Sequence, residues 1–88
     1  MPATPWQFVR LQRETRYVEL RLQPDLFGWV VMRITGDVQN GGATRRTTPC
    51  ADYPEAIHLW NREVRACKRR GYAPVAAAPE PSPPALSV

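Results

Sequence analysis

Three arginines flank a predicted turn in the middle of the chain, and their chemistry suits phosphate binding. Arg33 precedes an Asn-Gly pair at 40–41, and Arg45 and Arg46 follow it. Because Asn-Gly is a strong signal for a hairpin turn, these arginines are expected on two adjacent strands. A guanidinium group can bind two phosphate oxygens at once, so the three predict a compact anion-binding patch. The alternative is a set of solvated side chains on a strand face, with Arg33 paired to Asp37.

A second group of cations falls at the end of a predicted helix. Its members are Arg65, Lys68, Arg69 and Arg70. Successive turns at one helix end concentrate positive charge, which is typical of nucleic-acid contact. The alternative is that these cations only offset the negative end of the helix dipole. Both groups are therefore candidate sites for nucleic acid or another partner.

Groups that would support catalysis or metal binding do not occur in a recognisable pattern. Cys50, Cys67 and His58 lack the short spacing of zinc ligands, and the acidic residues are scattered with structural explanations as caps, turns or strand faces. No Gly-rich phosphate loop precedes a helix. The sequence therefore predicts a protein that is not an enzyme, with no cofactor, metal site or small-molecule substrate.

Length and composition restrict the class of protein further. The chain has 88 residues, 43% of them hydrophobic, with 12 Lys+Arg against 8 Asp+Glu and a formal net charge of +4. One small folded domain is expected. No apolar run is long enough to span a membrane, and the first residues do not resemble a signal peptide, so the expected location is the cytoplasm, without membrane contact. The two cysteines are expected as reduced thiols.

The last part of the chain differs in composition from the rest. Residues 73–88 contain half of the ten prolines and one charged residue, Glu80. A proline- and alanine-rich segment without periodicity buries too little apolar surface to offset its ordering entropy. The prediction is a folded domain at 1–72 and a disordered Pro/Ala-rich tail at 73–88, whose removal costs less than about 0.5 kcal/mol.

Hydrophobic periodicity predicts four strands in residues 1–49. Alternation of apolar and polar residues is clearest at 17–22, and Pro49 should end the last strand because it has no N–H for a ladder. The turn between the second and third strands contains Leu26 and Phe27, which are expected to pack onto the core. The predicted strands are 6–12, 17–22, 29–34 and 44–48.

A single long helix is predicted after the strands. Asp52 is the expected N-cap, with Pro54 in the first turn and Glu55 completing a capping box; Gly71 is the expected C-terminal stop. An apolar stripe at helical spacing should face the sheet, with Trp29 and Trp60 in the core. The stripe consists of Ala56, Ile57, Trp60, Val64 and Cys67. The fold class is α+β, a small antiparallel sheet of about four strands packed against one C-terminal helix.

Several segments match the residue pattern of a known domain family. They are Arg16-Tyr17, the run from Leu22 to Trp29, then Arg33, Gly36, Gly41-Gly42 and Arg45, and finally Arg70-Gly71-Tyr72. Over residues 8–72 the chain resembles the WGR domain, which is named for a Trp-Gly-Arg tripeptide and occurs in poly(ADP-ribose) polymerases and as small bacterial proteins. The run from Leu22 to Trp29 is the most specific part of this resemblance.

The name-giving tripeptide is degenerate in this chain. Its positions hold Thr35, Gly36 and Asp37, so only the glycine carries over. The resemblance implies a DNA-binding or interdomain module that uses this surface, yet Thr35 cannot stack on a base and Asp37 repels a phosphate. Thr35 and Asp37 are expected on an exposed edge near the hairpin turn, and period-two alternation should put 33, 35 and 37 on one face. The leading hypothesis is weak, sequence-nonspecific binding of DNA or RNA through basic residues, and the alternative is a protein-interaction adaptor that has lost the nucleic-acid contact.

Overall fold

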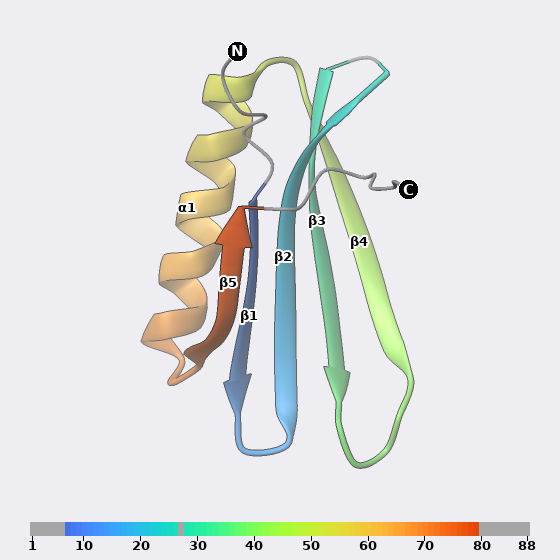
Figure 1. Cartoon of the computed structure of the whole chain (residues 1–88), viewed down its shortest axis with the longest axis vertical. Coiled ribbons are helices and arrows are strands. Elements are labelled where there is room, and N and C mark those ends of the chain that lie inside the picture. The colour runs from blue at the N-terminus through green and yellow to red at the C-terminus, as the bar shows by residue number, and fades with distance from the viewer. Residues whose placement is uncertain (1–6, 27, 80–88) are drawn as a thin grey trace.

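The computed structural model of the chain describes residues 7–26 and 28–79 (Figure 1). In chain order the elements are β1 Gln7–Arg13, β2 Arg16–Asp25, β3 Gly28–Asp37, β4 Ala43–Cys50, α1 Tyr53–Arg69 and β5 Ala73–Pro79. The strands form one antiparallel sheet of order β4-β3-β2-β1-β5. The predicted α+β class and single helix are confirmed, but the sheet has five strands where about four were predicted.

The additional strand lies in the segment that was expected to be a disordered tail. β5 pairs with β1, so the expectation is wrong for residues 73–79, and residues 80–88 lie outside the described part. Proline is tolerated because β5 is an edge strand, which pairs on one side only. The register shifts at Arg10/Leu11, which leaves Val75 without a partner in β1. Composition indicated a coil, but the adjacent open edge of β1 provides hydrogen-bond partners that stabilise a short strand.

Period-two alternation assigns the strand residues to two faces of the sheet. On β2, Val18, Leu20 and Leu22 are almost completely buried and face α1. The helix buries Ala56 and Cys67 against this face, and Trp60 packs against both parts of the core. The predicted helical stripe is therefore confirmed. Trp29 and Trp60 are partly buried at the margin of the core rather than fully enclosed.

The ends of α1 follow the signals in the sequence. The Asp52 side chain accepts a hydrogen bond from the Glu55 amide at 3.0 Å, and the Glu55 carboxylate accepts one from the Ala51 amide at 3.0 Å. At the other end Gly71 has a φ of +92°, and the Tyr72 amide donates to the Cys67 carbonyl at 3.1 Å. These bonds satisfy end groups that the helix itself leaves unpaired, and they turn the chain toward β5.

Two details of the strand connections differ from expectation. Leu26 is 90% exposed at the turn between β2 and β3 instead of packing on the core, and Phe27 lies outside the described residues. β2 continues to Asp25 and β3 begins at Gly28, so the connection is too short to fold back over the sheet. Pro49 also lies within β4 rather than ending it, because β4 is an edge strand.

Within the described ranges, no helix combines the length and the apolar character needed to cross a membrane.

Candidate functional site

The pairing of β3 with β4 brings two of the predicted cations together on the helix-facing side of the sheet. Arg33 lies opposite Arg46, and Thr35 lies opposite Thr44. Arg33 is also opposite the buried Leu20 of β2, which fixes this set of side chains on the face that α1 covers. The expectation that 33, 35 and 37 share one face is thereby confirmed. The expected edge position is wrong, since β3 lies between β2 and β4 and is not an edge strand.

The end of α1 supplies a third cation to the same place. Arg70 is the C-cap residue, and its position is fixed by its amide, which donates to the Cys67 carbonyl at 3.0 Å. Its own carbonyl accepts a hydrogen bond from the Arg13 guanidinium at 3.1 Å. Three cations from β3, β4 and the end of α1 therefore line one groove, although they are far apart in the sequence.

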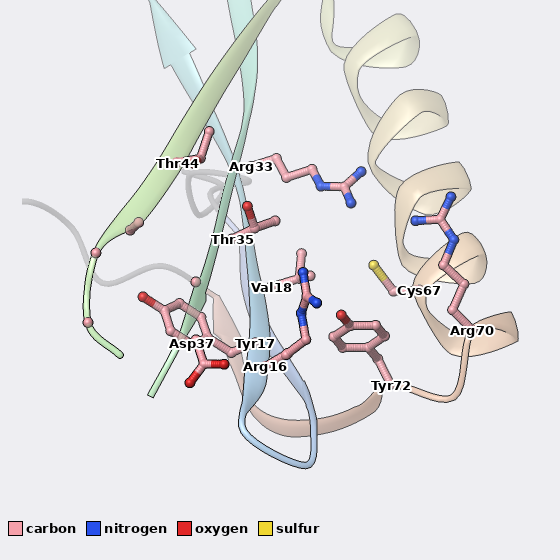
Figure 2. A pocket seen from close by; sticks show the side chains of 14 residues that line it. Arg16, Tyr17, Val18, Arg33, Thr35, Asp37, Thr44, Cys67, Arg70 and Tyr72 are labelled. Atoms are coloured by element: carbon pink, nitrogen blue, oxygen red, sulfur yellow. The ribbon is translucent and has the colours of Figure 1, made fainter. Parts of the chain in front are cut away.

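We call this feature the arginine groove. At one end of it lies a cavity of about 300 Å³, lined by Arg33, Thr35, Thr44, Arg46 and Arg70. The cavity adjoins a larger one of about 700 Å³ that shares four of these residues and extends to Arg16, Asp37 and Tyr72. Figure 2 shows the guanidinium groups of Arg33 and Arg70 reaching into the space between β3 and α1 from opposite sides. Two threonine hydroxyls lie among these cations.

The three arginines differ in how far acidic residues neutralise them. Arg33 donates to Glu63 on α1 at 2.9 Å, with both side chains about one quarter exposed. The pairing of Arg33 with Asp37 expected under the alternative interpretation is therefore wrong. In the described part of the chain, neither Arg46 nor Arg70 forms an ion pair with an acidic side chain. Positive charge in the groove is thus only partly compensated.

Asp37 lies at the other end of the groove and is held by the β3–β4 turn. Its carboxylate accepts hydrogen bonds from the amides of Gln39 at 2.8 Å and Asn40 at 3.3 Å, and from the Thr15 hydroxyl at 3.1 Å. These bonds, led by that from Gln39 and assisted by the charge of Arg16, lower the pKa of the Asp37 carboxyl. Asp37 is therefore ionised at neutral pH, and its charge disfavours phosphate at this end.

Arg16 and Tyr72 line the groove but were not predicted as site residues. Both belong to segments on which the resemblance to the WGR domain was based, Arg16-Tyr17 and Arg70-Gly71-Tyr72, and that resemblance was the available signal. Arg16 has no adjacent cation in the sequence, and the uncharged Tyr72 gave no sign of anion binding. Their convergence depends on the β1–β2 hairpin and the turn after α1, which bring residues distant in sequence together.

The remaining predicted cations lie elsewhere. Arg45 points to the other face of the sheet, since its neighbours Thr44 and Arg46 face the helix. Arg65, Lys68 and Arg69 are exposed on α1 and do not line the groove. The structure thus combines one member of the predicted helix cluster with two members of the predicted strand cluster, and separates the other four.

Two cations on the face of the sheet away from α1, Arg10 and Arg21, are occupied by other contacts. Arg10 binds Glu19 at 2.7 Å and lies over the Tyr17 ring at 4.1 Å. Arg21 lies over the Phe8 ring at 4.8 Å and 3.8 Å from Glu19. These ion pairs and cation–π contacts stabilise the paired strands. They make the open face of β1 and β2 a less available anion site than the groove.

The cysteines and acidic residues give no indication of other chemistry. Cys50 and Cys67 are free thiols, and burial raises the pKa of each, so both are protonated at neutral pH. Among residues 7–26 and 28–79, no group of three or more His, Cys, Asp or Glu side chains could hold a metal ion.

Comparisons with models of known protein families, with curated proteins and with solved structures return no match to this chain.

Proposed function

We propose that this chain is a small binding module that holds the phosphate backbone of nucleic acid in the arginine groove, without base specificity. The observation that carries the proposal is the convergence of Arg33, Arg46 and Arg70 from three different elements on one cavity. Solvated cations that serve only solubility have no reason to converge. Two of the three lack an acidic partner in the described chain, so their charge is available to a ligand.

The donors in the groove match the acceptors of a phosphodiester. Guanidinium groups donate in a planar fork that fits two phosphate oxygens, and threonine hydroxyls such as those of Thr35 and Thr44 donate a single bond. These contacts read the backbone rather than the base edges. We therefore expect affinities in the micromolar to 100 micromolar range at physiological salt, which is typical of nonspecific binding.

The resemblance to the WGR domain supports this proposal from the sequence side. It rests on the run from Leu22 to Trp29 and on Gly36, and it implies a DNA-binding or interdomain role. The tripeptide positions 35 and 37 flank the groove, yet they carry a hydroxyl and a carboxylate in place of a ring and a cation. We propose that the chain is a WGR-like module in which the groove arginines, rather than the tripeptide, bind the phosphate.

A pair of charge-matched double variants tests the proposal. Arg46→Ala with Arg70→Ala removes two groove cations, whereas Arg45→Ala with Arg69→Ala removes two exposed cations outside the groove. Net charge falls equally, so electrostatic attraction at long range is matched. Affinity for a fluorescein-labelled oligonucleotide is measured by anisotropy over a salt series starting at about 50 mM. Thermal melting confirms that each variant is folded.

The groove variant should lose affinity by about tenfold or more, and its slope of log K against log salt should be less steep by about 1.4–1.8. The control variant should lose only about twofold. Equal losses in both variants would contradict the assignment to the groove. If the wild type binds no nucleic acid at about 50 mM salt, the proposal fails and the protein-adaptor alternative takes its place.

A further inference from the structure

The arginine groove has two chemically different ends. Arg33, Arg46 and Arg70 surround the smaller cavity, whereas Arg16, Tyr72 and the Asp37 carboxylate line the larger one together with Arg33 and Arg70. A phosphate is attracted most strongly to the first end, because the Asp37 carboxylate offsets the charge of Arg16 at the second. A ligand that fits therefore carries one negatively charged group and, next to it, an uncharged group that fills the space beside the tyrosine.

Tyr72 is placed as a fixed platform in this larger cavity. Its amide donates to the Cys67 carbonyl at 3.1 Å, and the preceding Gly71 adopts the left-handed conformation that sets the direction of the chain. The ring is half buried, packing against the core around Cys67 and lining the cavity with its remaining surface (Figure 2). An aromatic side chain whose position is already fixed loses little entropy when a base stacks on it.

Duplex and single-stranded nucleic acid differ in whether they can use both ends of the groove. A duplex carries its phosphates on a convex outer surface and keeps its bases stacked on one another. It can reach the cations only from the rim and leaves Tyr72 without a base. A single strand can place one phosphate among the arginines and turn the adjacent base onto an aromatic ring.

From the juxtaposition of Arg33, Arg46 and Arg70 with Tyr72, we infer that the groove selects single-stranded over duplex nucleic acid. One phosphate lies at the arginine end, and the adjoining base stacks on the Tyr72 ring. At the larger cavity the Asp37 carboxylate offsets the charge of Arg16, so the arginine end is the preferred position for the phosphate. This inference rests on the proposed function, because it names the class of nucleic acid that the same groove binds.

The test compares one labelled oligonucleotide in two states with the full chain. The probe is an oligothymidylate of about 12 nucleotides, alone or annealed to its complement. Anisotropy at about 50 mM salt should give at least about fivefold tighter binding of the single strand, the minimum expected for one stacked base. Tyr72→Leu should remove most of this preference, whereas Tyr72→Phe, which keeps the ring, should retain it.

A second readout covers the case in which Tyr72→Leu does not fold. In the wild type, stacking of a thymine shifts the Tyr72 ring protons upfield in the NMR spectrum, and comparison with Tyr72→Phe assigns these signals. A duplex that binds as tightly as the single strand, or unshifted Tyr72 signals at saturation, would overturn the inference. If the Arg46/Arg70 variant loses duplex binding in that case, the proposed function still stands. Absence of binding to either probe overturns both.

Discussion

The phenol ring of Tyr17 on β2 occupies the space that a side chain at position 36 on β3 would need. The two residues are direct partners in the β2–β3 register. A Cβ atom built on Gly36 would lie 2.6 Å from the Tyr17 hydroxyl oxygen and 2.9 Å from the Gly42 carbonyl oxygen. Arg10 packs over the same tyrosine ring at 4.1 Å. Gly36 therefore allows a cross-strand packing of Arg10, Tyr17 and the bare β3 backbone.

Replacement of Gly36 by alanine should therefore destabilise the fold. The added methyl group must displace either the ring or the backbone at Gly42, which we expect to cost about 1–3 kcal/mol. Urea denaturation followed by circular dichroism measures the change in the free energy of unfolding. Combination with Tyr17→Ala should make the cost of Gly36→Ala smaller, because one of its two obstacles is gone.

Gly41→Ala is the matched control for this prediction. Gly41 has a positive φ of +68°, but a Cβ there meets nothing within 4 Å. Its cost should be limited to backbone strain of about 1 kcal/mol and should not depend on Tyr17. If Gly36→Ala and Gly41→Ala cost the same with or without Tyr17, the packing of Tyr17 against Gly36 does not restrict position 36.

Removal of β5 should destabilise the protein, contrary to the expectation from composition. Truncation after Tyr72 deletes the strand that pairs with β1 and exposes the edge beside Val9 and Leu11, which are now 5% and 0% exposed. We expect a loss of about 1–3 kcal/mol, seen as a lower midpoint of urea denaturation. Truncation after Pro79 retains β5 and serves as the control. Equal midpoints for the two truncations would show that β5 does not stabilise the sheet.

Most of the fold could be predicted because local signals and burial agree along most of the chain. The alternation at Val18, Leu20 and Leu22 identifies a strand with one buried face, and Asp52 with Glu55 identifies the helix start. β5 could not be predicted in this way. Its prolines and alanines have low strand propensity, and its stability comes from the open edge of β1, which is a tertiary feature.

The residue types of the candidate site could be predicted from the sequence, but which residues come together to form it could not. Adjacent positions such as Arg45 and Arg46 read as one patch in the sequence, yet a strand directs them to opposite faces. Arg70 and Arg33 line the same cavity only because α1 packs against the sheet. No local pattern encodes a contact that depends on the packing of a helix against a sheet.

The turn held by Asp37 predicts a pH-dependent contribution to stability. Its pKa is lowered in the folded state, chiefly by the hydrogen bond from the Gln39 amide, from an ordinary value of 3.8. The ionised form therefore stabilises the fold above pH 3.8, and this contribution disappears as the pH falls through the lowered folded pKa. Asp37→Asn should lower the melting temperature at pH 7 and converge with the wild type at strongly acidic pH. A constant difference across the titration would contradict the role of the charge.

Trp60 predicts a difference between two substitutions of the same side chain. It contacts both parts of the core, yet its indole nitrogen is buried without a hydrogen-bond partner among the described residues. Trp60→Ala should cost about 3–5 kcal/mol through the cavity it leaves. Trp60→Phe keeps a ring and removes the unpaired donor, so we expect a cost of about 1 kcal/mol or less. A phenylalanine variant as unstable as the alanine variant would contradict this prediction.

Glu63 should restrain nucleic-acid binding, because it holds Arg33 in an ion pair at the wall of the arginine groove. Glu63→Gln leaves the 2.9 Å contact without its negative charge and makes the Arg33 guanidinium available to a phosphate. We expect oligonucleotide affinity at about 50 mM salt to rise about two- to fivefold, with one further counterion released, while stability changes by less than about 1 kcal/mol. Glu55→Gln is the control, since it removes the same charge at the other end of α1 and glutamine can still complete the capping box. An equal rise in both variants would show that only net charge matters, whereas a rise confined to Glu63→Gln ties the ligand phosphate to Arg33.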